Sequence, residues 1–127
     1  MKLLLIEDDA DSAEAMALLL RTEGIEVDWA ASAGEALALF EADPARSIDV
    51  LMLDLMLPDM DARTLVSRLA AIAPLPAIIV HSAMTHEAAQ EAGRAVGALA
   101  VLRKPTDWGK MREVLGQCTG ARATPGH

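Results

Sequence analysis

The chain has 127 residues, which suits one domain of typical size, and 53% of them are hydrophobic, enough for a substantial core. Its formal net charge of −8 argues against nonspecific binding of nucleic acid by the whole surface. The single cysteine, Cys118, excludes an intramolecular disulfide framework and fits a reducing compartment. No apolar run approaches the ~20 residues that span a bilayer, so we expect a cytoplasmic protein with no membrane segment.

Charge is distributed unevenly along the chain. Residues 1–61 contain 15 acidic and 3 basic side chains, whereas residues 62–127 contain 4 acidic and 8 basic ones. The acidic half could hold a cluster that faces a cation, or it could form an ordinary solvated surface. Composition alone leaves both interpretations open.

The first predicted elements are a strand and a helix. Lys2–Ile6 is a short apolar run, and the acids that begin at Glu7 end it too early for a signal peptide. Asp11, followed by Glu14 three residues later, has the pattern of a helix N-cap. The helix should end at Gly24.

A second strand and a second helix follow. Residues 25–30 alternate between apolar and polar side chains, which predicts a half-buried strand near an edge of the sheet. The side chains expected on its buried face are Ile25, Val27 and Trp29. Ser32 with Glu35 repeats the capping pattern and should open a helix that runs to about residue 42.

The third predicted strand, residues 48–53, is almost uniformly apolar. Such a run is typical of a strand buried on both faces of a parallel sheet. Asp54 ends the run, and Pro58 prevents the strand from continuing as a hydrogen-bonded ladder. An acid at this end of a strand would lie in the crevice where open α/β sheets bind ligands.

The second half of the chain continues the alternation. It predicts a helix over residues 62–73, a strand over residues 77–81, a helix over residues 85–96 weakened by Gly93, a strand over residues 99–102 and a helix over residues 107–115. Five strands alternating with five helices predict a flavodoxin-like, doubly wound (βα)5 domain of the α/β class, with a five-stranded parallel sheet and helices on both faces. We expect this domain to occupy residues 1–117, and residues 118–127 to form a flexible tail or the start of a linker.

Polar side chains follow four of the five predicted strands. These residues are Glu7, Asp8 and Asp9 after the first strand, Asp54 after the third, Ser82 after the fourth and Lys104 after the fifth. Each of them alone has an ordinary explanation as a turn residue or as an acid that leads into a helix. Because the carboxyl ends of parallel strands share one edge of a sheet, we instead expect these side chains to meet in one crevice.

The residue types in this crevice suit phosphoryl chemistry. Clustered carboxylates repel one another, and Mg²⁺ compensates them with carboxylate, carbonyl and water ligands. A lysine supplies a positive charge for a phosphate oxygen, and a serine hydroxyl can donate a hydrogen bond. An aspartate can itself attack phosphorus and form an aspartyl phosphate. A site where a phosphoryl group is passed to Asp54 follows from this combination.

The motifs together resemble the response-regulator receiver domain of two-component signalling, over about residues 1–116. The matching pieces are Glu7-Asp8-Asp9, Asp54 with Pro58 and Asp61, Ser82-Ala83, Gly97-Ala98 and Lys104-Pro105. The resemblance implies a phosphorelay protein, similar to chemotaxis response regulators, that accepts a phosphoryl group from a histidine kinase or histidine phosphotransfer protein. It implies Mg²⁺, or Mn²⁺, as the cofactor, and no enzymatic activity beyond the protein's own phosphorylation and dephosphorylation.

The resemblance also implies a role for each site residue. Asp54 would be the phosphoacceptor, Lys104 would hold a phosphoryl oxygen, and Ser82 would turn toward the phosphoryl group on activation. The metal ligands would be Glu7, Asp8, Asp54 and the backbone carbonyl of Met56, with Asp9 as a candidate outer acid. Receivers usually carry an aromatic partner for this serine switch, and Val101 stands in its place. Ala62 replaces a usual glycine, and Thr106 replaces a frequent phenylalanine.

Two methionines are expected beside the phosphoryl group. Met56 and Met84 lie two residues beyond Asp54 and Ser82, and the resemblance places their side chains next to the site. A methionine cannot orient an attacking water by hydrogen bonding as Asn, Gln or Glu could. Slow self-dephosphorylation is therefore expected.

The resemblance points to an output face formed by the fourth helix, the fifth strand and the last helix. Receivers use this face for homodimers or targets, and the residues expected on it are Arg94, Arg103, Trp108, Lys110 and Arg112. His81 should point away from Ser82 and pack in the interior, because successive side chains of a strand face opposite ways. We expect Cys118 to be an inert thiol in the tail, and no direct binding of nucleic acid or membrane.

Three other functions were weighed against this one. A degenerate receiver would bind partners without phosphorylation, and the missing aromatic at Val101 keeps this alternative open. An aspartyl-phosphate phosphatase of the haloacid-dehalogenase type would need a second acid where Met56 stands. A flavodoxin-like cofactor binder would need a phosphate-binding loop where Glu7, Asp8 and Asp9 would repel its ligand.

Overall fold

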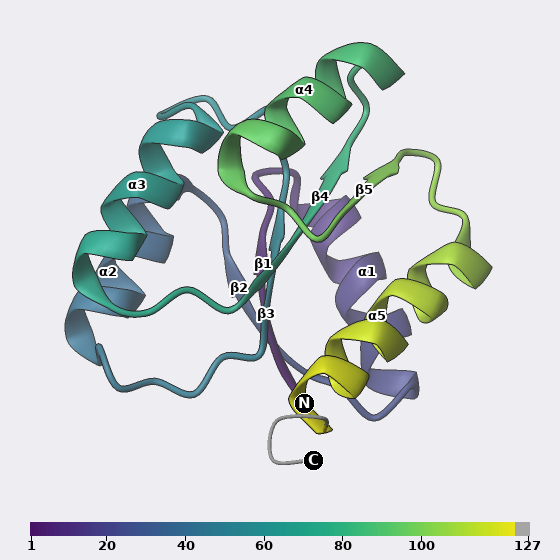
Figure 1. Cartoon of the computed structure of the whole chain (residues 1–127), viewed down its shortest axis with the longest axis horizontal. Coiled ribbons are helices and arrows are strands. Elements are labelled where there is room, and N and C mark those ends of the chain that lie inside the picture. The colour runs from purple at the N-terminus through teal and green to yellow at the C-terminus, as the bar shows by residue number, and fades with distance from the viewer. Residues whose placement is uncertain (124–127) are drawn as a thin grey trace.

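The computed structural model describes the backbone of residues 1–123 and the side chains of residues 1–118. Strands and helices alternate along the chain (Figure 1). Their order is β1 (Lys2–Ile6), α1 (Ala10–Thr22), β2 (Glu26–Ala30), α2 (Ala33–Ala42), β3 (Val50–Leu53), α3 (Ala62–Ile72), β4 (Ala77–Ser82), α4 (His86–Val96), β5 (Ala100–Arg103) and α5 (Trp108–Ala123). None of the described helices is long and apolar enough to cross a membrane.

The five strands form one parallel sheet in the order β2-β1-β3-β4-β5. This order confirms the doubly wound, flavodoxin-like fold expected from the sequence, and it places β2 at an edge. The strand order reverses direction between β1 and β3. That switch point is where open α/β sheets bind their ligands, and both strands end there in acidic residues.

The helices cover both faces of the sheet (Figure 1). On one face, α1 and α5 contribute side chains such as Met16, Leu20 and Met111 to a buried cluster with the sheet. On the other face, α2, α3 and α4 contribute Phe40, Leu65 and similar side chains to a second cluster. Alternate side chains of the central strands enter each cluster, so these strands are apolar on both faces, as their sequence predicts.

Three expectations about element ends and burial are wrong. Asp9, not Asp11, is the N-cap of α1, because its carboxylate accepts the backbone N–H of Ser12. The Trp29 side chain is 44% exposed at the edge strand instead of facing the core. The last helix continues past residue 115 to Ala123, so the expected tail begins as helix; only residues 124–127 lie outside the described part of the chain.

Two of these differences have a clear physical cause. The Trp29 indole N–H donates to the backbone carbonyl of Glu7 at 2.7 Å, which holds the ring over the edge of the sheet. Cys118, expected in a tail, lies on α5 instead. Its side chain is buried in the cluster that α1 and α5 form with the sheet, which we call the α1–α5 cluster. Its burial extends the apolar stripe of α5 beyond Gly116 and gives the helix a reason to continue.

Gly93 has a packing role that the sequence did not reveal. A Cβ atom built at this position of α4 would lie 2.4 Å from Cγ2 of Val101 on β5. Glycine lowers helix propensity, but here it lets the helix backbone approach the sheet closely. Gly93, which we expected to weaken the helix, is therefore the residue at which α4 packs closely against β5.

Candidate phosphoryl-transfer site

The ends of β1, β3, β4 and β5 bring the expected site residues to one edge of the sheet. Backbone hydrogen bonds extend the strand pairing beyond the strands: Asp54 N–H donates to the Ile6 carbonyl at 3.0 Å, and Lys104 N–H donates to the Ser82 carbonyl at 2.9 Å. These bonds fix the backbone from which each functional side chain projects. The structure thus brings together Glu7, Asp8, Asp54, Ser82 and Lys104, which lie on four different strand ends.

An acid cluster, formed by Glu7, Asp8 and Asp54, occupies this edge. One carboxylate oxygen from each lies within 4.8 Å of the other two. Glu7 is 3% and Asp54 6% exposed, whereas Asp8 is open to solvent. Three hard oxygen donors, two buried and one exposed, suit a divalent cation that keeps some of its waters, so the donor set fits Mg²⁺.

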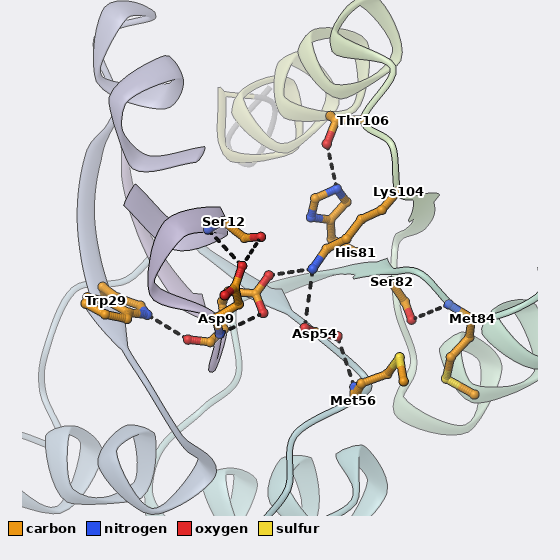
Figure 2. A network of polar contacts seen from close by, with 11 residues as sticks. Asp9, Ser12, Trp29, Asp54, Met56, His81, Ser82, Met84, Lys104 and Thr106 are labelled. Carbon is orange, nitrogen blue, oxygen red and sulfur yellow. Dashed lines mark hydrogen bonds and ion pairs between the residues drawn. The ribbon is translucent and has the colours of Figure 1, made fainter. Parts of the chain in front are cut away.

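Lys104 reaches into the acid cluster (Figure 2). Its Nζ lies 2.5 Å from Glu7 Oε1 and 3.4 Å from Asp54 Oδ2. Burial alone would lower the pKa of Lys104, but the hydrogen bond to Glu7 and the negative charges of Asp54 and Glu7 outweigh it and raise the pKa. Lys104 is therefore the cation that balances the two buried carboxylates.

The pKa values of the two buried acids, Glu7 and Asp54, shift in opposite directions. Burial and the neighbouring Asp54 raise the pKa of Glu7 to about 7, although Lys104 opposes the change. Burial also acts against ionised Asp54, but hydrogen bonds from Glu7 and from the Met56 N–H, with the charge of Lys104, lower its pKa overall. Asp54 is thus the carboxylate that stays ionised, as a nucleophile must.

Asp9 does not join the acid cluster. Its carboxylate accepts hydrogen bonds from the backbone N–H and the hydroxyl of Ser12, at 3.1 and 2.5 Å. These bonds lower the pKa of Asp9 and use the side chain to cap α1. The candidate outer acid of the sequence analysis is therefore a helix cap.

Asp54 and Ser82 each accept a backbone hydrogen bond from the loop that follows them, after β3 and β4 respectively. The Met56 N–H donates to Asp54 Oδ1 at 3.0 Å, and the Met84 N–H donates to Ser82 Oγ at 3.1 Å. Figure 2 shows both methionines on these loops at the edge that carries Asp54 and Ser82. The Met56 side chain is 58% exposed.

Sequence reasoning missed one clamp on the β3–α3 loop. The Asp59 carboxylate accepts the backbone N–H groups of Ala33 and Gly34, at 3.2 and 3.0 Å, at the start of α2. These bonds lower the pKa of Asp59 and tie the loop that follows Asp54 to a neighbouring helix. Asp59 stands 25 residues from Gly34, so no local pattern could have revealed the contact.

His81 and Thr106 form a second contact that was not foreseen. His81 is packed in the interior, as expected, but its Nε2 also lies 2.9 Å from Thr106 Oγ1, in the loop after Lys104 (Figure 2). The sequence signal for this pair was available: Thr106 departs from the usual phenylalanine, and a polar side chain there needs a partner.

The basic residues expected on the output face do not all lie together. Arg94, Arg103 and Lys110 are exposed on α4, β5 and α5, and Trp108 is half-buried against the α1–α5 cluster. Arg103 Nε donates to the Met84 carbonyl at 3.1 Å, which connects β5 to the β4–α4 loop. Arg112 instead pairs with Glu23, at the end of α1, at 2.7 Å.

Comparison with known proteins places residues 3–116 within the response regulator receiver domain family. A response regulator receiver protein of Anaeromyxobacter sp. (strain Fw109-5) is 42% identical over 80% of this chain and 42% of its own length. The sensory transduction protein RegX3 of Mycolicibacterium smegmatis is 36% identical over 80% of this chain and 43% of its own. The chain thus spans less than half the length of these curated relatives.

The fold has close counterparts among solved structures. A response regulator receiver domain protein from Clostridium thermocellum superposes with a TM-score of 0.82, is 26% identical, and the match covers 96% of each chain. The agreement therefore extends over nearly the whole chain.

Proposed function

The chain belongs to the response regulator receiver domain family, a signalling module of two-component systems, and from that premise we propose that it accepts a phosphoryl group on Asp54. The single observation that carries the proposal is the acid cluster with Lys104 inserted between Glu7 and Asp54. An ionised aspartate beside a lysine, at the switch point of the sheet, combines a nucleophile with a cation for the transferred group.

Glu7, Asp8, Asp54 and the carbonyl of Met56 are the proposed ligands of Mg²⁺, or of Mn²⁺ in its place. The bound metal would supply positive charge that stabilises the transferring phosphoryl oxygens. The hydrogen bond from Met56 N–H to Asp54 Oδ1 fixes the peptide that carries the proposed carbonyl ligand. The exposure of Asp8 leaves one side of the cluster accessible from solvent.

The transfer step uses groups that the structure already holds close together. An Asp54 carboxylate oxygen attacks phosphorus, an O–P bond forms, and the bond from phosphorus to the donor's imidazole nitrogen breaks with its electron pair returning to the ring. The donor is a phosphohistidine of a histidine kinase or histidine phosphotransfer protein. Lys104 exchanges its contact with Asp54 for one with a phosphoryl oxygen.

Ser82 is the proposed sensor of the new group. Its side chain is completely buried, and its Oγ accepts the Met84 N–H. The phosphoryl group, which carries a charge of about −2, would draw the hydroxyl toward one of its oxygens and carry the β4–α4 loop with it. Val101, which packs against Gly93, moves with β5 and α4 instead of acting as an aromatic rotamer switch.

The output would be protein binding through α4, β5 and α5, either in a homodimer or with a target. Arg94, Arg103 and Lys110 are exposed on these three elements, while the acid cluster lies at the carboxyl edge of the sheet. Arg112 is the weakest member of the proposed face because it is paired with Glu23. A phosphatase function would need an acid where Met56 stands, so we do not favour it.

Intact-mass analysis after incubation with acetyl phosphate and Mg²⁺ tests the proposal. The parent protein should gain the mass of one phosphoryl group, and Asp54→Asn should gain none. Asp11→Asn, which removes an exposed acid of α1, is the matched control and should behave like the parent. No gain in the parent would reject phosphorylation and leave a receiver that binds partners without it.

A further inference from the structure

His81 is a buried histidine that the proposed transfer step does not use. It precedes Ser82 on β4, so its side chain lies on the opposite face of the strand from the serine. The side chain is 5% exposed and lines a cleft of about 290 Å³ against the α1 residues Met16 and Leu19. Its one polar contact among the described residues is the 2.9 Å hydrogen bond between Nε2 and Thr106 Oγ1.

The ring is neutral in this environment. Burial is the main reason why the pKa of His81 falls to about 4, and the positive charge of Lys104 adds to it, while Asp54 opposes it. A neutral imidazole and a threonine hydroxyl can each donate or accept, so one tautomer of the ring always satisfies the pair. The contact is therefore a hydrogen bond between two neutral groups.

The bond holds the loop that carries Lys104. On one side of Lys104, its own N–H is bonded to the Ser82 carbonyl at 2.9 Å. On the other side, two residues along, Thr106 is bonded to His81. Both partners belong to the end of β4, so the loop is attached to β4 before and after the lysine (Figure 2). A backbone held on both sides positions the lysine side chain more precisely for contact with a phosphoryl oxygen.

We propose that His81 is a positioning residue, which acts through Thr106 to aim Lys104 at the phosphoryl group on Asp54. The inference rests on the proposed function, because it assigns Lys104 a role in the transfer. It differs from a general packing role in one respect. It predicts that the function of Lys104 is impaired while the proposed metal ligands, which follow β1 and β3 and do not lie on the β5–α5 loop, keep theirs.

Two substitutions at Thr106 separate the hydroxyl from the shape of the side chain. Thr106→Val keeps the branched shape and removes the hydroxyl, whereas Thr106→Ser keeps the hydroxyl. The rate of phosphorylation by acetyl phosphate is followed by intact mass over a range of donor concentrations, and Mg²⁺ affinity is measured by calorimetry. Thr106→Val should lower the maximal rate by roughly tenfold, since small misplacements of a catalytic group are costly. Its Mg²⁺ affinity should not fall below that of the parent, and Thr106→Ser should be phosphorylated at the parent's rate.

Each other outcome overturns the inference. A Thr106→Val protein that is phosphorylated as fast as the parent shows that the bond does not position Lys104. If Thr106→Val loses both phosphorylation rate and Mg²⁺ affinity, Thr106 has a role in folding the whole site. If Thr106→Ser is phosphorylated slowly, the shape of the side chain matters and the hydroxyl does not. A parent protein that gains no phosphoryl group removes the proposed function itself, and this inference with it.

Discussion

At the scale of single residues, the acid cluster is balanced by a cation from the chain itself. Lys104 Nζ contacts carboxylate oxygens of both Glu7 and Asp54, the two buried members of the cluster. A divalent cation that binds these carboxylates competes with the lysine for their negative charge. In the proposed function, Lys104 would therefore oppose metal binding before transfer and stabilise the phosphoryl group after it.

The first prediction removes this competing charge. Lys104→Met, which keeps a long side chain, should raise Mg²⁺ affinity by roughly fivefold, equivalent to about 1 kcal/mol for a partly exposed ion pair. The same variant should be phosphorylated at least tenfold more slowly, because a donor to the transferring group is lost. Lys110→Met, an exposed lysine on α5, is the control and should change neither quantity. Weaker Mg²⁺ binding in Lys104→Met would contradict the competition.

The second prediction concerns the lifetime of the phosphorylated protein. Neither Met56 nor Met84 can hold a water for attack on phosphorus, so phospho-Asp54 should decay slowly in Mg²⁺ buffer. Met56→Asn and Met84→Glu should each speed the decay, which is measured by intact mass over time. Decay of the parent within seconds would show that another group activates the water.

The third prediction is a pH dependence of stability that comes from His81. The folded-state pKa of His81 is about 4, below its ordinary value near 6.5, so between these values the unfolded chain binds a proton that the folded chain does not. Stability is lost as pH falls from about 6.5 to 4, by up to about 3 kcal/mol from this group. Urea unfolding of the parent and of His81→Gln at pH 7 and pH 4.5 measures it. The parent should lose more stability than the variant, and equal losses would contradict a buried neutral ring.

At the scale of elements, the fit between α4 and β5 depends on the absence of a side chain. Gly93 lets the helix backbone lie against Val101. The close approach of α4 fills the space that a larger side chain at position 101 would occupy. An aromatic residue at position 101, as in most receivers, would need space in which its ring can rotate. In this chain Val101 and the backbone of α4 occupy that space. The two elements therefore form one packed unit.

The fourth prediction tests this fit with a pair of glycines. Gly93→Ala should lower the free energy of unfolding by about 1 kcal/mol or more, because overpacking outweighs the gain in helix propensity. Gly116→Ala, in α5 where a Cβ would meet nothing within 4 Å, should instead raise it by up to about 1 kcal/mol. Adding Val101→Ala to Gly93→Ala should recover part of the loss. A stabilised Gly93→Ala protein would show that α4 can move away at little cost.

Local patterns predicted the elements well where one residue decides their ends. Ser32 caps α2, as its sequence indicates, and α4 begins within one residue of the predicted position 85. The start of α1 was misplaced by two residues because Asp9 and Asp11 are both suitable caps, and only the hydrogen bond to Ser12 distinguishes them. The end of α5 was misplaced because Gly116 usually ends helices, whereas burial of Cys118 against another helix extends this one.

At the scale of the whole molecule, four segments of the chain supply one site. The residue types at the strand ends predicted the members of the acid cluster, because parallel strands present their carboxyl ends at one edge. The pairwise contacts could not be predicted, since Lys104 and Glu7 are 97 residues apart and the lysine also contacts Asp54. Asp59 shows the same limit: a polar loop residue gives no sign of which helix it caps.

The location of the phosphoryl group tests the central claim most directly. The protein is incubated with acetyl phosphate and Mg²⁺ and then reduced with borohydride, which converts an aspartyl phosphate to homoserine, and its peptides are sequenced by mass spectrometry. Homoserine should appear at position 54 alone, because Asp54 is the buried acid whose pKa is lowered beside Lys104. Homoserine at position 8 or at any other acid, with position 54 unchanged, would contradict the account.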